Sequence, residues 1–116
     1  MTTFETAVSQ AIGLLMAASR QIDQMPSAEA TAAAEYELLH LSTGALLAAH
    51  RARHLLPVDV LIDEPAVTHA IPIDQVIGAH ELLIGQLQGV DPFELLELVA
   101  DVGNLCQDLR RYDRLH

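Results

Sequence analysis

Apolar residues recur along the chain at alternating steps of four and three, the period of a helix that buries one face. The first run is a heptad seam that consists of Phe4, Val8, Ala11, Leu15, Ala18, Ile22 and Met25. Thr2 and Glu5 have the spacing of a capping box at its start, and Pro26 ends it. The pattern predicts a helix over residues 3–24.

The longest helical pattern covers residues 27–56, with Ser27 as its N-cap and Pro57 as its stop. One face is rich in alanine and consists of Ala34, Leu38, Leu41, Ala45, Ala48, Ala49, Ala52 and Leu56. The far side combines three histidines with Tyr36, Thr43 and Leu47. One face of this helix therefore suits its own core. The opposite face carries more apolar surface than a face exposed only to water needs.

Residues 57–72 contain three prolines, and Val58, Val60 and Ile62 alternate as in a strand. We expect either an extended crossover or a short hairpin there. Helical periodicity returns over residues 73–88 and again over residues 92–112. The seam of the last helix consists of Leu95, Val99, Val102, Cys106 and Leu109. The chain is therefore predicted to be a single all-α domain over residues 1–116, a four-helix bundle with one long connector.

Charge narrows the range of partners. The chain has 16 carboxylates, six arginines and no lysine, so its formal net charge is −10. Nucleic acid and anionic membrane surfaces need clustered cations and are not expected as partners. A basic protein surface stays open, because ten carboxylates and no arginine lie between Arg53 and Arg110. The first residues lack the pattern of a secretion signal and no stretch has the length of a membrane span, so a cytoplasmic protein is expected.

The histidines of the long helix raise the question of a metal. His50 and His54 are one helical turn apart, a spacing at which two imidazoles can share an ion. No third ligand follows from the sequence, and exposed histidines are also favoured at a helix C-terminus. We therefore interpret the pair as solvated residues, keep it only as a weak metal candidate, and predict no cofactor.

Glu37 and His40 have the Glu-x-x-His spacing of carboxylate-bridged di-metal bundles. Such a site also needs carboxylates that project inward from the other helices. Glu97, Asp101 and Asp108 lie opposite the seam of the last helix and are expected to face water. A di-metal centre within one chain is therefore disfavoured.

His80 lies within the apolar arc of the third helix, so a buried imidazole is expected, and a buried polar group needs a partner. We predict a hydrogen bond to Glu37, on the assumption that the second and third helices are antiparallel neighbours, or otherwise one to Tyr36, Thr31 or a backbone carbonyl. His80, Glu37, His40 and Tyr36 form the candidate ligand site. A core histidine without any ligand is the simpler interpretation of His80.

No nucleophile elbow, phosphate loop or dinucleotide fingerprint occurs, and Cys106 is interpreted as a core residue. An enzyme is therefore not favoured. Our first hypothesis is a non-enzymatic interaction module that forms a homodimer through Leu39, Thr43, Leu46 and Leu47. The alternatives are a small-molecule or metal-binding bundle and an acidic antagonist of a basic protein.

Overall fold

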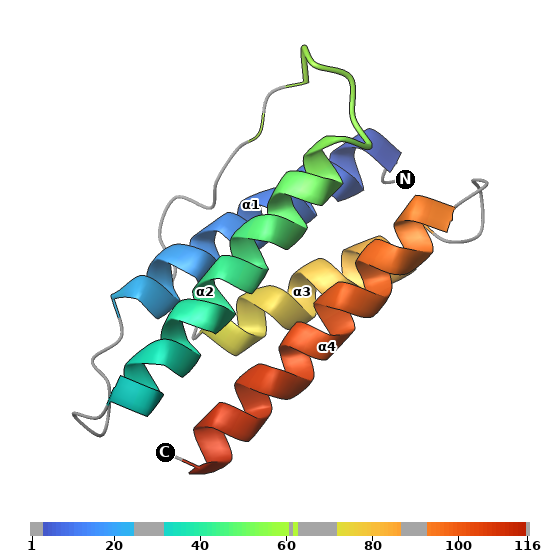
Figure 1. The fold of residues 1–116 in the computed structure, drawn as a ribbon. Coiled ribbons are helices and arrows are strands. Elements are labelled where there is room, and N and C mark those ends of the chain that lie inside the picture. Colours follow the sequence, from blue (N-terminus) through green and yellow to red (C-terminus); the bar gives the residue numbers. More distant parts are fainter. Residues whose placement is uncertain (1–3, 25–31, 61, 63–71, 87–92, 116) are drawn as a thin grey trace.

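The computed structural model describes residues 4–24, 32–60, 62, 72–86 and 93–115. It contains four helices, which are α1 (Phe4–Asp23), α2 (Ala32–Arg53), α3 (Pro72–Ile84) and α4 (Phe93–Leu115). They pack side by side into a bundle (Figure 1). The all-α fold class and the four-helix bundle are thus confirmed. No helix among the described residues has the length and apolar character needed to cross a membrane.

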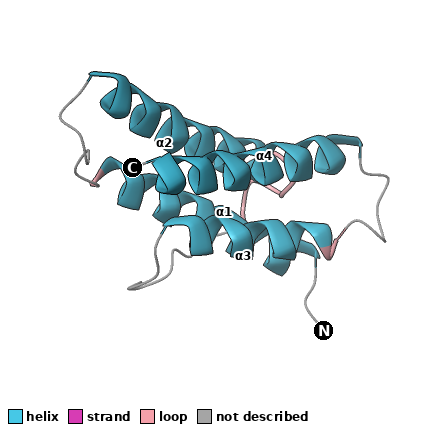
Figure 2. Cartoon of the chain, turned by 90° about the horizontal axis from the view of Figure 1, so that it is seen from below, coloured by secondary structure: helices cyan, strands magenta, loops and turns pink. Residues whose placement is uncertain are grey.

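The helices are arranged in a square. α1 packs against α2 and α3, and α4 packs against the same two helices, so α2 and α3 occupy opposite corners (Figures 1 and 2). Each packed pair is antiparallel, and α2 and α3 therefore run in the same direction (Figure 1). The end of α2 and the start of α3 lie at opposite ends of the bundle. Most of the connection between them, residues 61 and 63–71, lies outside the described residues, so the predicted crossover stays a prediction.

The core is built mostly of aliphatic side chains, as the low aromatic content requires. The α1 seam from Val8 to Ile22 is buried, and so is the inner face of α2 from Leu38 to Leu56. The side chains of Met25 and Ala34 lie outside the described part of the structure. On α4, the predicted seam is buried except for Val99, which is partly buried, and three further buried residues were not predicted, namely Leu98, Leu105 and Tyr112.

The helix ends differ from prediction by a few residues. α2 stops at Arg53 because the amides of His54, Leu55 and Leu56 bond three residues back and tighten the last turn. The Arg53 guanidinium then donates to the carbonyls of Pro57 and Val58, at 2.9 Å each. α4 continues to Leu115 rather than to residue 112.

α3 ends at Ile84, before the predicted end at residue 88, and Gly85 and Gln86 form a turn. The described start of the connector is also a turn, closed by the amide of Val60 on the carbonyl of Pro57. Strand-like alternation was therefore wrong for Val58, which is 95% exposed, whereas Val60 and Ile62 both pack against the core. The possible hairpin at residues 63–65 lies outside the described residues.

Two buried hydroxyls join α1 to α2. The Oγ atoms of Ser19 and Ser42 lie 3.0 Å apart, and both residues are buried. Ser42 Oγ is 2.5 Å from an oxygen of Asp23, to which it donates, and the Ser19 hydroxyl lies 3.1 Å from the Ser42 carbonyl oxygen. A hydroxyl has one proton and can donate one hydrogen bond. Because Ser42 donates to the charged carboxylate of Asp23, Ser19 is the donor in the bond between the two serines.

Candidate functional site

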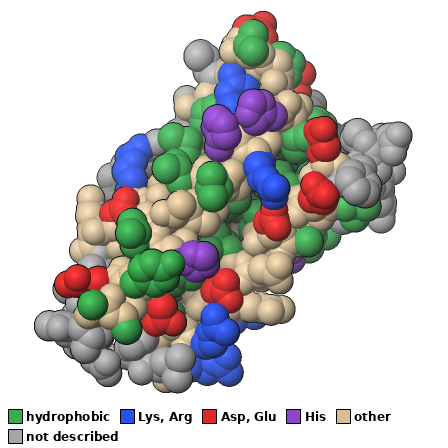
Figure 3. Space-filling model, viewed as in Figure 1, with side chains coloured by type: hydrophobic (Ala, Val, Ile, Leu, Met, Phe, Trp, Pro, Cys, Tyr) green, Lys and Arg blue, Asp and Glu red, His purple; other side chains and the backbone are tan. Residues whose placement is uncertain are grey.

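The outward side of α2 is the most apolar exposed surface of any one helix in the described structure. Tyr36, Leu39, Leu46 and Leu47 are 71, 62, 54 and 58% exposed, and Thr43 is exposed between them. We call these five residues the outer face of α2. Hydrophobic and histidine side chains gather over this helix in Figure 3. The orientation predicted for the four proposed interface residues is correct, and their role stays a prediction.

A groove of about 550 Å³ lies between α1 and α2 beside this face. Its walls are mostly apolar, and Leu46 and Leu47 form part of its rim. The lining residues are Ile12, Met16, Leu46, Leu47, Ala49, His50, Arg53 and Ile62. A space of this size with apolar walls can accept side chains of a partner or a small apolar molecule.

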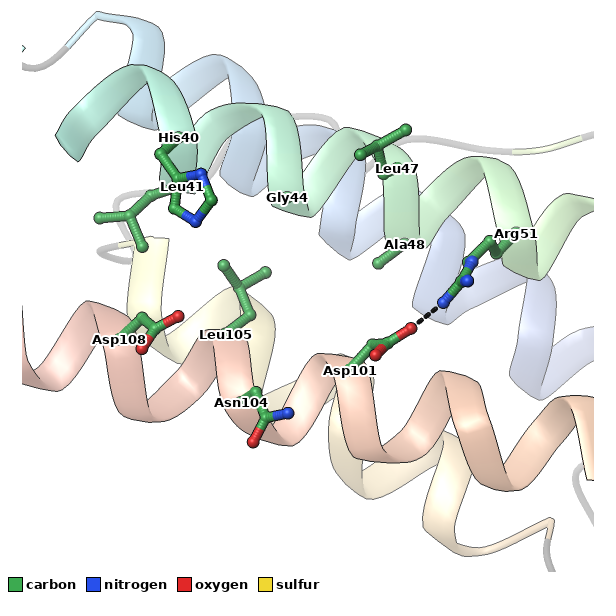
Figure 4. Close-up of a pocket in the computed structure, with 10 residues that line it drawn as sticks. All are labelled: His40, Leu41, Gly44, Leu47, Ala48, Arg51, Asp101, Asn104, Leu105 and Asp108. Carbon is green, nitrogen blue, oxygen red and sulfur yellow. Dashed lines mark hydrogen bonds and ion pairs between the residues drawn. The ribbon is translucent and has the colours of Figure 1, made fainter. Parts of the chain in front are cut away.

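A second groove, of about 460 Å³, separates α2 from α4 on the other side of the outer face. Figure 4 shows His40, Gly44 and Leu47 along its α2 wall. Arg51 crosses one end of the groove to form an ion pair with Asp101 of α4. Both side chains are about half exposed, so water screens the pair and it adds little stability.

The pair of histidines at the end of α2 is held close together. Both side chains are exposed, yet their Nε2 atoms are only 3.3 Å apart. The two ring planes are nearly perpendicular, at 89°, with centroids 4.8 Å apart. In this form one imidazole donates a hydrogen bond to the other, so one nitrogen is protonated and its neighbour accepts.

His80 does not meet Glu37, and the predicted hydrogen bond between them is wrong. A Cβ placed on Gly103 would lie 3.2 Å from His80 Nε2, so the imidazole packs on α4. A Cβ placed on Gly44 of α2 would lie 3.5 Å from Leu105 of α4, so these two residues are at the same level along the bundle. Glu37 is therefore about nine residues, or ~13 Å, from the level of His80 along the bundle.

The expectation of a buried imidazole also needs correction, because His80 is only partly buried. The buried arc of α3 is centred on Val76, Ala79 and Leu83, which leaves His80 on its shoulder towards α4. The candidate ligand site is thus not assembled as proposed. Tyr36 and His40 are exposed and Glu37 is partly buried on α2, whereas His80 belongs to the α3–α4 contact.

The carboxylates of α4 have the predicted orientation. Glu94, Glu97 and Asp101 are exposed, and Asp108 is partly exposed with its carboxylate 3.3 Å from the Arg111 guanidinium. Within the described part of the chain, no group of three or more histidine, cysteine or carboxylate side chains is placed to hold one metal ion. A metal held by this part of one chain would therefore need ligands from water or another molecule.

Cys106 is buried on the α4 seam, as predicted. Burial raises the pKa of its thiol, and the charge of Arg110 together with a backbone hydrogen bond offsets part of this rise. Arg110 lies one turn further along α4, an effect that sequence reasoning had overlooked. A raised pKa leaves the thiol protonated near neutral pH, which opposes a role as a nucleophile.

Sequence reasoning missed two features of the site region. Gln75 is 3% exposed in the first turn of α3, and no donor–acceptor partner for its Nε2 occurs among the described residues. The apolar α1–α2 groove was also missed, because Ile62 of the connector forms part of it. The burial of Gln75 could have been predicted from the sequence, because this residue directly precedes Val76 on the buried side of the predicted helix.

Comparisons of this chain with protein-family models, curated proteins and solved structures found no match.

Proposed function

We propose that this chain is a non-enzymatic, cytoplasmic interaction module that forms a homodimer through the outer face of α2. The observation that carries the proposal is the cluster of Tyr36, Leu39, Leu46 and Leu47, each more than half exposed on one helix. Isolated exposed apolar residues are common on proteins, but several along one helix face are typical of an interaction surface.

Charge supports a second copy of the chain as the occupant. The protein carries a formal net charge of −10, so most of its surface repels another copy. α2 is an exception, because its two glutamates and two arginines balance. A dimer joined through α2 therefore brings together the least repulsive surfaces.

The distribution of those charges favours an antiparallel pair. Glu35 and Glu37 lie in the first part of α2, and Arg51 and Arg53 lie at its end. In a two-fold dimer with antiparallel α2 helices, the acidic end of one protomer meets the basic end of its partner. A parallel pair would place like charges together at both ends, which is unfavourable.

We place the two-fold axis of this dimer at the level of Ala45, midway between Thr43 and Leu47, which brings Glu37 of one protomer level with Arg53 of its partner. Thr43 of one protomer then packs against Leu47 of its partner, and Leu46 lies close to the axis. The α1–α2 groove begins beside Leu46 and Leu47, so it can receive side chains from the partner. Such an isologous contact closes on itself and leaves a dimer rather than a filament.

Sedimentation equilibrium over a range of concentrations tests the proposal. We expect a mass of twice the 12.6 kDa chain at high concentration, falling towards the single-chain mass on dilution. Leu47→Arg should weaken association at least about tenfold, because it places a charge in the apolar contact. Leu96→Arg is the matched control, since Leu96 is 51% exposed on α4, away from the outer face. A single-chain mass at all concentrations, or equal effects of both variants, would contradict the proposal.

A second candidate function is the binding of a small apolar molecule. The observation that favours it is the α1–α2 groove of about 550 Å³ with mostly apolar walls. Native mass spectrometry of protein purified without a tag from its own host would detect a retained molecule. If Met16→Arg removes that molecule and Leu96→Arg does not, the groove is its site; a retained molecule in both variants would exclude the groove.

A further inference from the structure

We propose that His50 and His54 form a two-histidine site for a divalent transition-metal ion on the surface of α2. Both ligands come from one chain, but His50 also lines the α1–α2 groove beside the outer face. The metal titration is therefore made with the Leu47→Arg variant as well, so that metal binding and dimer formation are tested separately.

The distance between the two imidazoles is the first argument. Their Nε2 atoms are 3.3 Å apart. Two nitrogens that each lie about 2.0–2.1 Å from a tetrahedral zinc ion are about 3.3–3.4 Å apart, so the observed separation already matches that of two ligands on one ion. The helix supplies this geometry, since residues four apart lie above one another on the same face.

The chemistry of the donors is the second argument. Imidazole nitrogen suits Zn²⁺, Cu²⁺ and Ni²⁺, whereas Mg²⁺ and Ca²⁺ prefer oxygen. In the structure, the Nε2–H group of one imidazole donates a hydrogen bond to Nε2 of the other. Metal binding would replace that hydrogen bond by two metal–nitrogen bonds. The donating ring would change tautomer, so that its proton moves from Nε2 to Nδ1 and the Nε2 lone pair becomes free for the metal. No oxidation or reduction is involved.

The charged side chains around the two histidines favour a cation on balance. Arg51 and Arg53 are positive, but Arg51 is paired with Asp101, and the Arg53 guanidinium is held by two carbonyls of the following turn. Glu94 and Glu97 line a hollow of about 190 Å³ together with Arg51 and His54. Their carboxylates and the large negative charge of the whole protein favour a cation here.

The side chains are exposed, and the described part of the chain does not add a third ligand. The remaining coordination positions are therefore filled by water. A site with two protein ligands is weaker than a structural zinc site with four, and it exchanges its ion with the solution.

Calorimetric titration of tag-free protein with ZnCl₂, NiCl₂ and CuCl₂ tests the proposal. We expect one ion per chain, with Cu²⁺ bound more tightly than Ni²⁺ or Zn²⁺ and no heat from MgCl₂. His50→Ala and His54→Ala should each weaken Zn²⁺ binding by at least about tenfold. Circular dichroism of both variants checks that the helices are retained.

His40→Ala is the matched control, because His40 is also exposed on α2 but has no histidine one turn away. It should bind Zn²⁺ as the unaltered chain does. Binding that survives in either His50→Ala or His54→Ala, or that is lost in His40→Ala, would overturn the assignment. So would the absence of any Zn²⁺ heat at millimolar protein concentration.

Discussion

The imidazole of His80 packs directly on Gly103, where a Cβ would lie 3.2 Å from Nε2. Because Gly103 has no side chain, the His80 imidazole of α3 can lie directly against the backbone of α4 at this position. A Cβ at residue 103 would therefore be closer to the imidazole than in ordinary van der Waals contact, but the imidazole is partly exposed and can move. Replacement of the glycine therefore sets a gain in helix propensity against a local clash.

Gly103→Ala should accordingly stabilise the domain more when His80 is removed. Alanine is favoured over glycine inside a helix by about 1 kcal/mol, and the clash with His80 subtracts from that gain. We expect Gly103→Ala to raise the free energy of unfolding by about 1 kcal/mol in a His80→Ala background and by less in the unaltered chain. Urea denaturation of the four proteins measures this coupling.

Gly44→Ala provides the control for that cycle. A Cβ at Gly44 would lie 3.5 Å from Leu105, an ordinary contact distance. Its gain should be the same with or without His80. If Gly103→Ala gave equal changes in both backgrounds, the imidazole would not restrict the α3–α4 contact.

The buried hydroxyls between α1 and α2 should behave as one unit. Ser19→Ala and Ser42→Ala should each lower the free energy of unfolding by roughly 0.5–1.5 kcal/mol, because each removes one hydrogen-bond partner from a buried pair. The double variant leaves neither hydroxyl in the core, so its cost should be smaller than the sum of the two. Additive costs in thermal or urea unfolding would show that the two serines act independently.

The sequence was sufficient to predict the four helices and the inner faces of α1 and α2. Steps of three and four among small aliphatic residues define the buried side of α1 and α2 without knowledge of the neighbouring helices. Helix ends were less predictable, because they depend on contacts such as that of the Arg53 guanidinium with the carbonyls of Pro57 and Val58. Those contacts form only after the chain has turned.

Which helices are neighbours could not be derived from periodicity. The same seams fit a bundle in which α2 contacts α3 and one in which the two occupy opposite corners. Only the second occurs, and it separates His80 from Glu37. The His50 and His54 spacing was visible in the sequence, but the approach of their Nε2 atoms depends on side-chain rotamers that spacing does not determine.

Alkaline pH should destabilise the domain through Cys106. Burial raises the pKa of this thiol in the folded protein above its value in the unfolded chain. The stabilising contribution is therefore complete below the unfolded pKa, close to 9.0, and is lost as the pH rises through the folded value. Between these two pKa values the thiol is ionised in the unfolded chain and still protonated in the folded one, so a rise in pH favours unfolding.

Cys106→Ala separates this effect from packing. Loss of the side chain should lower stability by a constant amount from about pH 6 to pH 8, and the difference from the unaltered chain should narrow above about pH 9. Urea unfolding at each pH, with both proteins in the same buffers, measures the difference. A difference that stayed constant up to about pH 10 would show that the thiol has no raised pKa.

The antiparallel orientation of the proposed dimer can be tested by cross-linking. With the two-fold axis near Ala45, Leu46 of one protomer lies only ~3 Å along the helix axis from Leu46 of its partner. The two Leu39 side chains are ~18 Å apart along that axis, too far for a disulfide. Leu46→Cys should therefore form a disulfide-linked dimer under mild oxidation, and Leu39→Cys should not. Non-reducing electrophoresis separates the products, with the unaltered chain as the control because its single Cys106 is buried. Efficient linkage of both variants would indicate parallel helices and would exclude the charge pairing on which the antiparallel arrangement rests.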